Sequence, residues 1–270
     1  RLEGEEMPVQ IEGFDGGDRT DIRLPGTQEA LLKKIHALGK PVVLLLMNGS
    51  ALAVNWAAEH VPAIVEAWYP GQSGGDAIAE VLFGDANPGG KLPLSFYKSV
   101  ADIPPFDDYQ LEGHTYRYFQ GETLYPFGYG LSYTDFSFDE LQIDRPQVEV
   151  AGEVAVTIRV TNSGARAGDE VVQLYVRQQD PFVSRPVKKL MGFTRVTLAS
   201  GESNWVTFTL HSSQFGAHEG GSTYVVRPGT VEVLVGNSSE HHPLSGTIEV
   251  TGQPMDVSTN RVFFSVANQQ

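Results

Sequence analysis

The chain has 270 residues, 41% of them apolar, and a formal net charge of −14, so it is long enough for two domains of ordinary size. Its negative charge makes nucleic acid and anionic membranes unfavourable partners, whereas a neutral sugar is not repelled. The absence of cysteine excludes disulfides and thiolate metal sites, and no apolar run approaches the ~20 residues that a membrane-spanning helix needs.

The first 105 residues alternate between helical and strand patterns. Apolar residues recur at helical spacing within residues 26–39, with Thr27 as the expected N-cap and Gly39 as the expected C-cap. The unbroken apolar run at 41–47 predicts a strand that is buried on both faces. The alternation continues with a helix at 52–60, a strand at 63–68 and a helix at 76–83. This order predicts a parallel sheet covered by helices.

A different composition begins near Asn87 and continues to Tyr133. This stretch is rich in Pro, Gly, Tyr and Phe and has no helical period. We interpret it as a long ordered connector held by aromatic burial, and we assign residues 106–134 to it as a separate segment after residues 1–105. Its aromatic clusters at 115–119 and 125–133 are suited either to stacking on sugar rings or to packing between two domains.

The remainder, residues 135–270, has the pattern of an all-β domain. Apolar and polar residues alternate in five segments, at 154–161, 170–177, 205–210, 229–235 and 247–251. Turn sequences separate them, at 162–164, 200–202 and 227–229. Several short alternating strands with such turns predict a β-sandwich.

Three carboxylates crowd into the amino-terminal loop, at Glu3, Glu5 and Glu6. Neighbouring like charges raise one another's pKa, and a carboxylic acid that stays protonated near neutral pH can give its proton to a leaving oxygen. The alternative is an acidic loop that is simply solvated. Arg1 is not a methionine and no signal-peptide core follows it, so we expect further residues upstream.

A second candidate is the Gly-Gln-Ser-Gly-Gly sequence at 71–75, which fits the nucleophile elbow of serine hydrolases around Ser73. A triad would also need a histidine, and His114 in the connector is the candidate closest to this part of the chain. The alternative, which we favour, is a tight turn before a helix. Phosphate-binding glycine loops and metal-ligand histidine spacings are absent from the sequence, which predicts neither a metal nor an organic cofactor.

Several sequence blocks together resemble glycoside hydrolase family 3 in order and spacing. The most specific are Trp-Tyr-Pro-Gly-Gln at 68–72, Asn-Pro-Gly-Gly-Lys-Leu-Pro at 87–93 and Pro-Phe-Gly-Tyr-Gly-Leu-Ser-Tyr-Thr at 126–134. The resemblance covers nearly the whole chain and continues into the β-sandwich at 164–175, 189–193 and 198–202. It implies an α/β sandwich portion followed by a fibronectin type III-like sandwich.

The resemblance also implies a function. Family 3 enzymes remove β-linked sugars from non-reducing ends with retention, using an aspartate nucleophile on a barrel domain and an acid/base glutamate on a loop of the α/β sandwich. The acid/base position corresponds to Glu5. The next residue, Glu6, stands where the family often has glycine, and it is the fallback.

The expected activity is that of a β-glucosidase, with β-xylosidase as the close alternative. The nucleophile belongs to a barrel that these residues do not contain, so the chain alone is expected to be inactive. Tyr116, Arg117 and Tyr118 are candidates to approach the substrate. A secreted or periplasmic location is expected, and homo-oligomer formation is left open. Two other classes remain as alternatives: a non-catalytic sugar-binding module and a serine hydrolase using Ser73.

Overall fold

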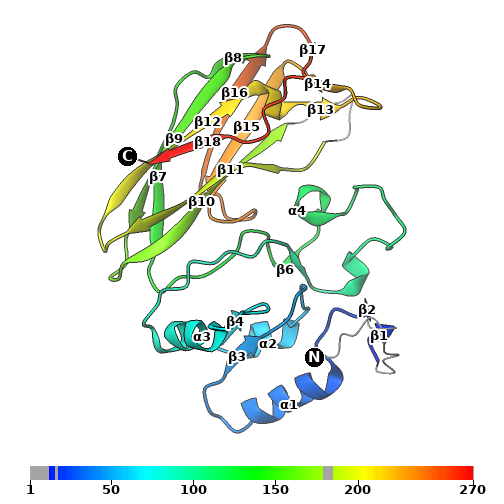
Figure 1. The fold of residues 1–270 in the computed structure, drawn as a ribbon, viewed down its shortest axis with the longest axis vertical. Helices are drawn as coiled ribbons and strands as arrows, with labels where there is room; N and C mark the ends of the chain where they lie inside the picture. Colours follow the sequence, from blue (N-terminus) through cyan, green and yellow to red (C-terminus); the bar gives the residue numbers. More distant parts are fainter. Residues whose placement is uncertain (1–11, 16–17, 179–184, 270) are drawn as a thin grey trace.

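The structure is a computed structural model that describes residues 12–15, 18–178 and 185–269. A helix-containing part lies at one end and a large β-sandwich at the other, with an irregular connector between them (Figure 1). This architecture confirms the predicted order of an α/β part followed by a β-sandwich.

Within its described residues, the α/β part contains two parallel strands and three helices. In chain order it comprises α1 (Gly26–His36), β3 (Val43–Leu46), α2 (Asn55–His60), β4 (Ala63–Glu66) and α3 (Gly74–Phe83). A short hairpin of β1 (Phe14–Asp15) and β2 (Asp18–Arg19) precedes them. Strands β3 and β4 pair in parallel from Val43–Ala63 to Leu46–Glu66, because α2 crosses between them. Helix α3 ends where Gly84 adopts the left-handed conformation at φ 84°.

Two details of α1 differ from the sequence prediction. The helix begins directly after Pro25, which is its N-cap, so Thr27 lies inside the first turn and does not cap it. Proline holds its own φ near the helical value, which lets the helix start there without a side-chain cap. The helix also ends at His36, and tighter turns lead to Gly39, whose N–H donates to the His36 carbonyl oxygen at 3.0 Å.

The prediction that the first apolar strand is buried on both faces is wrong for this structure. Leu46 is 5% exposed, but Val43 is 51% exposed. The sheet that the structure describes here has two strands, and no third described strand extends it. The small core of this part therefore gathers on one side, around Leu32, Leu46, Leu52, Val54, Ala57 and Val61.

In the structure the connector begins earlier than the assigned 106–134 and extends over residues 87–134; it is mostly irregular but contains short regular pieces that the sequence pattern did not predict. These are β5 (Phe96–Tyr97), a 3-10 turn at Val100–Asp102, α4 (Thr115–Tyr118) and β6 (Thr123–Tyr125). Phe96 is almost fully buried, and its ring packs edge-on against Trp68 at 6.2 Å and Tyr125 at 6.1 Å. Aromatic burial thus holds this segment against the α/β part.

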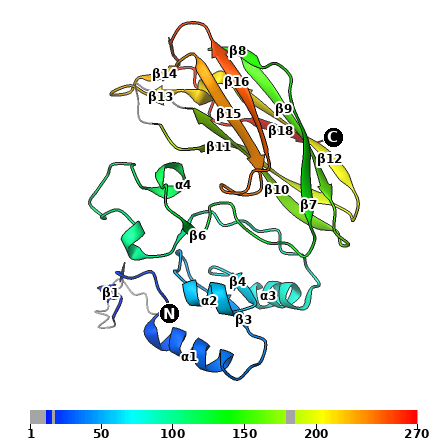
Figure 2. The ribbon, with the colours of Figure 1, turned by 180° about the vertical axis from the view of Figure 1, so that it is seen from behind.

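The sandwich consists of two antiparallel-rich sheets with a common core. One sheet has the order β11-β10-β15-β16-β8 and the other β18-β12-β9-β7. A small third sheet, β13-β14-β17, lies at the end of the sandwich (Figure 2). All five predicted strands are present and are contained in β9, β10, β12, β15 and β16. The strand bounds are β7 (Phe136–Ile143), β8 (Gln147–Glu149), β9 (Glu153–Asn162), β10 (Gly168–Gln178), β11 (Lys189–Leu198), β12 (Ser203–His211), β13 (Ala217–His218), β14 (Tyr224–Val226), β15 (Gly229–Gly236), β16 (Leu244–Thr251), β17 (Met255–Asp256) and β18 (Val266–Gln269).

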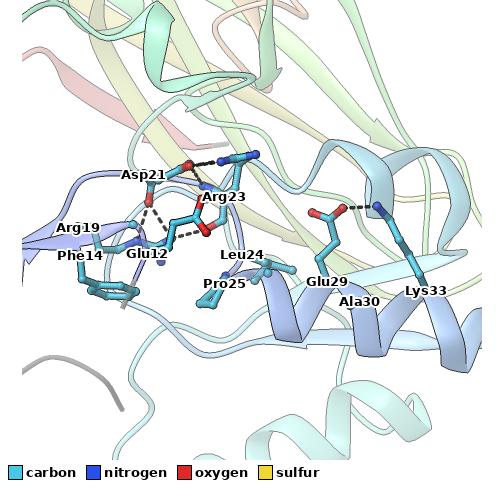
Figure 3. Close-up of a pocket in the computed structure, with 12 residues that line it drawn as sticks. Glu12, Phe14, Arg19, Asp21, Arg23, Leu24, Pro25, Glu29, Ala30 and Lys33 are labelled. Atoms are coloured by element: carbon cyan, nitrogen blue, oxygen red, sulfur yellow. Dashed lines mark hydrogen bonds and ion pairs between the residues drawn. The ribbon is translucent and has the colours of Figure 1, made fainter. Parts of the chain in front are cut away.

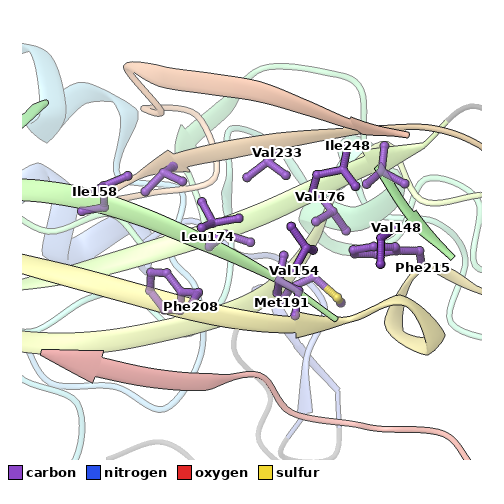
Figure 4. Close-up of a cluster of buried hydrophobic side chains, with 14 of the residues drawn as sticks. Val148, Val154, Ile158, Leu174, Val176, Met191, Phe208, Phe215, Val233 and Ile248 are labelled. Atoms are coloured by element: carbon purple, nitrogen blue, oxygen red, sulfur yellow. The ribbon is translucent and has the colours of Figure 1, made fainter. Parts of the chain in front are cut away.

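Alternation in the sequence explains the core of the sandwich. In β9 every second residue from Val154 is buried, and the intervening residues face outward. The inward side chains of both sheets interdigitate, as Figure 4 shows for Ile158, Leu174 and Phe208. Burial of each such side chain stabilises the fold by roughly 1.5–3 kcal/mol. The sandwich buries many more of them than the α/β part and therefore has the larger core.

The connector docks on the sandwich through buried polar groups. Lys91 Nζ lies 2.7 Å from Glu170 Oε1 of β10, and the two side chains are only 11% and 4% exposed. Lys91 also donates to the Gly130 carbonyl oxygen at 2.8 Å, and Asn237 Nδ2 donates to Glu170 Oε2 at 3.0 Å. Both carboxylate oxygens and the ammonium group therefore have partners, which is the condition under which a buried charge pair is tolerated.

Breaking this pair should cost much more stability than breaking an exposed one. We expect Glu170→Gln to lower the free energy of unfolding by about 3 kcal/mol, because it leaves the Lys91 ammonium buried without a counter-charge. The measurement is urea unfolding followed by circular dichroism.

Lys98→Met is the matched control, because Lys98 forms a 2.6 Å ion pair with Glu122 in which both side chains are largely exposed. It should cost clearly less than Glu170→Gln, because an exposed ion pair contributes little to stability. If Glu170→Gln were no more destabilising than Lys98→Met, the buried Lys91–Glu170 pair would contribute no more to stability than an exposed ion pair does.

Candidate functional site

A hollow with a volume of about 290 Å³ lies at the start of α1, between that helix and the hairpin before it (Figure 3). Its walls carry several charged side chains together with Phe14 and Leu24. The charged residues are Glu12, Arg19, Asp21, Arg23, Glu29 and Lys33. Such a mixture of carboxylates, guanidinium groups and an aromatic ring is suited to a ligand that carries many hydroxyl groups.

The charged residues of the hollow hold one another in place. Asp21 accepts hydrogen bonds from the Arg23 backbone N–H at 2.9 Å and from Arg23 Nε at 2.8 Å. Arg19 donates to the Asp21 carbonyl oxygen at 3.1 Å. The hydrogen bonds from Arg23 keep the pKa of Asp21 below its usual range. Asp21 is therefore ionised at neutral pH and can accept hydrogen bonds, but it cannot serve as a proton donor.

A second group of polar residues lies at the carboxyl ends of the two parallel strands. Glu66 is the last residue of β4, and Asn48 follows β3 by two positions. In α/β sheets, ligands bind outside the carboxyl ends of the strands. Glu66 Oε1 accepts the Trp68 N–H at 3.0 Å. Glu66 Oε2 and Asn48 Oδ1 are buried and accept no hydrogen bond from any residue that the structure describes.

Backbone strain occurs at the same place. Trp68 has a φ of 54°, in the left-handed region that a bulky side chain rarely adopts. The hydrogen bond from Trp68 to Glu66 and the edge-on contact with Phe96 hold this conformation. Strained residues of this kind cluster at functional sites. Trp68 and Glu66 therefore make this strand end the second part of the candidate site.

The two parts of the candidate site share a loop. The Ala53 N–H donates to the Ile22 carbonyl oxygen at 2.8 Å, and Arg23 forms an isolated parallel bridge with Ala53. The loop that begins at Asn48 therefore ends against the segment that lines the hollow.

The predicted acid/base residue and its fallback, Glu5 and Glu6, lie outside the described residues. Of the three predicted substrate contacts, Tyr116 packs between the connector and the sandwich: its ring stacks on Phe127 at 4.3 Å and meets Tyr175 edge-on at 5.9 Å. Its hydroxyl accepts the Leu190 N–H at 3.1 Å. Arg117 is exposed and Tyr118 is half-buried on the same short helix, α4. Their contact with a substrate stays a prediction.

The structure offers no support for a serine hydrolase. Ser73 is exposed at the N-terminus of α3, and within the described residues no histidine forms a hydrogen bond to it. Pro70 packs so closely under Gly74 that a Cβ there would lie 2.4 Å from the proline ring. The Gly-Gln-Ser-Gly-Gly sequence is therefore a tight strand-to-helix turn, as the alternative interpretation predicted.

Comparison with known proteins identifies the family. The profile of the glycosyl hydrolase family 3 C-terminal domain matches residues 3–133, and that of a fibronectin type III-like domain matches residues 170–239. The chain is also 48% identical, over 88% of its length, to a xylan 1,4-β-xylosidase of Xylanibacter ruminicola, covering 27% of that protein. The chain belongs to glycoside hydrolase family 3. The resemblance inferred from the sequence blocks is thereby confirmed.

Named relatives of this family carry two activities. A second relative is a periplasmic β-glucosidase of Salmonella typhimurium. The chain is 40% identical to it over 83% of the chain's length, and the match covers 31% of that protein. The chain thus spans about a third of the curated relatives that it matches.

Solved structures of β-glucosidases share the fold. A β-glucosidase from Erythrobacter marinus matches 93% of the chain and 34% of its own length, with 37% identity and a TM-score of 0.80. A β-glucosidase from Listeria innocua, solved with laminaribiose, matches 89% of the chain and 35% of its own length, with 35% identity and a TM-score of 0.76.

Membrane-spanning helices and metal clusters are not among the features of the described residues. No helix in this part of the chain is both long and apolar enough to cross a membrane. In residues 12–15, 18–178 and 185–269, no three His, Cys, Asp or Glu side chains gather in a way that could hold a metal ion.

Sequence reasoning missed Glu66. Its signal was a single carboxylate at the end of an otherwise apolar strand, Ala63-Ile-Val-Glu66, directly ahead of the Trp-Tyr-Pro-Gly-Gln block. A charged residue that closes a buried parallel strand is placed where α/β proteins bind ligands. That rule, applied to the amino-acid sequence alone, selects Glu66.

The titration of Glu66 leads to a test. Burial raises the pKa of Glu66 above its ordinary value, although the hydrogen bond from the Trp68 N–H lowers it in part. The folded state then binds more protons than the unfolded state, so this carboxyl makes the free energy of unfolding fall as pH rises above the ordinary value of 4.5. We expect the stability of Glu66→Gln relative to the wild type to increase from about pH 4 to about pH 7, as measured by urea unfolding at several pH values.

Glu122→Gln is the control of opposite sign. A hydrogen bond from Lys98 lowers the pKa of Glu122, so its carboxylate stabilises the fold above the ordinary pKa. Stability of this variant relative to the wild type should decrease slightly over the same range, because the Glu122 side chain is exposed. If the free energy of unfolding changed with pH in the same way for the wild type and for Glu66→Gln, the pKa of Glu66 would not be raised by its burial.

Proposed function

We propose that this chain supplies the acid/base part of the active site of a retaining, exo-acting β-glycosidase. The observation that carries the proposal is its membership of family 3, with relatives named β-xylosidase and β-glucosidase that match more than four fifths of the chain. The nucleophile is assigned to a barrel domain of the same enzyme that lies outside these residues.

In this proposal Glu5 is the proton donor. A retaining glycosidase holds two carboxyl groups roughly 5 Å apart, one of which attacks the anomeric carbon while the other protonates the leaving oxygen. The second group then removes a proton from the water that releases the sugar. Crowding with Glu3 and Glu6 favours the protonated form of Glu5 that the first step requires. Glu6 is the fallback for the same role.

The uncovered surface of the α/β part supports the proposed barrel partner. An apolar stripe in the α1 region is exposed and consists of Leu31, Ile35 and Leu38. Leu32 of the same helix is buried. Helix α1 lies at the end of the molecule away from the sandwich (Figures 1 and 2). A contiguous apolar surface of this kind is typical of a face that another domain covers, and the remaining two thirds of the relatives' length can provide that domain.

The sugar is proposed to be a non-reducing-end β-D-glucoside, with a β-xyloside as the second candidate. The xyloside is favoured by the 48% identity with a xylan 1,4-β-xylosidase and the 42% identity with a second protein named β-xylosidase. The glucoside is favoured by the β-glucosidases among the structural relatives. A secreted or periplasmic location is proposed with support from the periplasmic relative.

Replacement of the proposed acid tests the mechanism. In the complete enzyme, Glu5→Gln should lower kcat/KM for aryl glycosides with poor leaving groups by about 10²–10⁴-fold, since those groups need a proton to depart. Aryl glycosides with good leaving groups should lose far less in the bond-breaking step. The measurement is steady-state and burst-phase kinetics over a series of substituted phenyl glycosides.

Glu6→Gln is the matched control, because it removes a neighbouring carboxylate of the same loop. In this variant kcat/KM should depend on the leaving group of the phenyl glycoside as it does in the wild type. The reverse result would transfer the role to Glu6, and no effect of either substitution would refute the assignment of this loop. The 270-residue chain by itself should hydrolyse none of these substrates.

The sugar preference is tested with the complete enzyme on 4-nitrophenyl β-D-glucoside and β-D-xyloside. We expect the glucoside to have the higher kcat/KM, by about tenfold, because a site shaped for the C6 hydroxymethyl group gains contacts that a pentose lacks. A higher kcat/KM for the xyloside would establish the second candidate instead.

A further inference from the structure

Four cationic side chains gather where α4 meets the sandwich. Arg117 belongs to α4, Arg185 precedes β11, Lys189 is the first residue of β11, and Arg261 precedes β18. Two hydrogen bonds bring α4 to this position: the Val187 N–H donates to the Arg117 carbonyl oxygen at 2.6 Å, and the Leu190 N–H donates to the Tyr116 hydroxyl oxygen at 3.1 Å. We call these four residues the β11 cation cluster.

Tyr224 joins two members of the cluster. Lys189 Nζ lies 3.4 Å from the Tyr224 hydroxyl oxygen and 3.1 Å from the Gln214 carbonyl oxygen. The guanidinium carbon of Arg261 lies 3.8 Å from the centroid of the Tyr224 ring. Neutral groups therefore account for these contacts of Lys189 and Arg261, and they leave the two positive charges uncompensated.

Two carboxylates of the sandwich pair with cations that do not belong to the cluster. Glu219 pairs with Arg227 at 2.5 Å, and Glu240 pairs with Lys188 at 2.8 Å. Among the described residues, Arg117, Lys189 and Arg261 form no ion pair with any of the chain's acidic side chains. This is unusual in a chain with a net charge of −14, and it points to an external anion.

Burial raises the free energy of these unpaired positive charges, because it removes them from water. Burial lowers the pKa of Lys189 to about 8, and the positive charges of Arg261, Arg117 and Arg185 contribute to the same shift. Arg261 Nε is buried and has no hydrogen-bond acceptor in the described part of the chain. A guanidinium group that stacks on a ring keeps its N–H groups in the ring-parallel plane, where they can meet a carboxylate in a bidentate manner.

Exposed aromatic rings lie beside the cations. The Arg261 guanidinium carbon is 4.9 Å from the centroid of Phe263, which is 66% exposed, and the next residue, Phe264, is 85% exposed. Exposed apolar groups next to a charged site mark an interaction surface. A ligand that matches both features carries an anionic group and a flat apolar face.

We propose that the β11 cation cluster is a second saccharide site, which binds the carboxylate of a uronic acid unit while Phe263 provides an apolar surface for the sugar ring. The planar carboxylate fits the fork of an arginine, and a pyranose presents C–H groups on one face. The proposal rests on the proposed function only in taking the ligand to be a saccharide. It requires neither the nucleophile nor the proton donor.

Binding to the 270-residue chain tests the proposal without any catalysis. The probes for isothermal titration calorimetry are a xylo-oligosaccharide with one glucuronic acid substituent, the same oligosaccharide without it, and a sulfated monosaccharide. We expect the acidic oligosaccharide to bind at least about tenfold more tightly than the neutral one. Its affinity should fall as salt is added, because the contact is ionic.

Two variants locate the site. Arg117→Gln should weaken binding of the acidic oligosaccharide at least about fivefold, and because Arg117 is exposed this variant should retain the wild-type Tm. Arg145→Gln is the matched control, since Arg145 is an exposed arginine that pairs with Asp144 at 2.9 Å, away from the cluster. It should bind as the wild type does.

Equal affinity for the acidic and neutral oligosaccharides, or an Arg117→Gln variant with unchanged affinity, would overturn the proposal. Equal binding of the sulfated sugar would overturn the assignment to a carboxylate. A failure of the Glu5 experiment would leave this result untouched, because the two readouts share no step.

Discussion

The buried ion pair between Lys91 and Glu170 is the contact on which the arrangement of the two domains depends. Lys91 belongs to the segment that leaves the α/β part, and Glu170 lies on a central strand of the sandwich. A buried charge without a partner of opposite charge is strongly destabilising, so Lys91 and Glu170 each require the other domain to supply their partner. The Gly130 carbonyl and the Asn237 amide complete the network and restrict it to one geometry.

The blocks at 87–93 and 126–134, two of those that resemble family 3, meet at this interface. Gly128 of the Pro-Phe-Gly-Tyr-Gly block adopts a φ of 81° and approaches Gln173 so closely that a Cβ there would lie 2.1 Å from the glutamine oxygen. Gln173 in turn donates to the Gly128 carbonyl oxygen and accepts the Tyr175 hydroxyl at 2.5 Å. A glycine is required at position 128 by this contact. These blocks are therefore specific because they fit one interface between the connector and β10.

The same docking has consequences for the functional surfaces. It anchors α4 against β11, which places Tyr116 in the interface and brings Arg117 beside the cations of the sandwich. The candidate site at the strand ends is held separately, by the aromatic contacts of Phe96 and Trp68. The connector thus links two surfaces of different character. One has paired charges and a half-buried acid beside the α/β sheet, and the other has clustered cations beside exposed phenylalanines.

The sequence by itself determined the order of the domains, the type of nearly every long element and the family. Local patterns carry this information. The alternation of apolar and polar residues at 154–161 favours a strand whichever segments pack against it. The left-handed residue that ends α3 requires only a glycine at position 84. The sequence also separated the serine turn from a true nucleophile elbow by favouring the tight turn around Ser73. The proposed acid/base residue Glu5 came from the family resemblance and lies outside the described residues.

Tertiary structure decided what depends on which segments become neighbours. The exposure of Val43, the raised pKa of Glu66 and the strain at Trp68 depend on what packs around a two-stranded sheet, and no local pattern encodes those neighbours. The cation cluster joins residues that are up to 144 positions apart, from Arg117 to Arg261 (261 − 117), so its charge density is invisible along the chain. Local patterns follow from short-range sterics and hydrophobic periodicity, whereas burial and electrostatic coupling are set by distance in space.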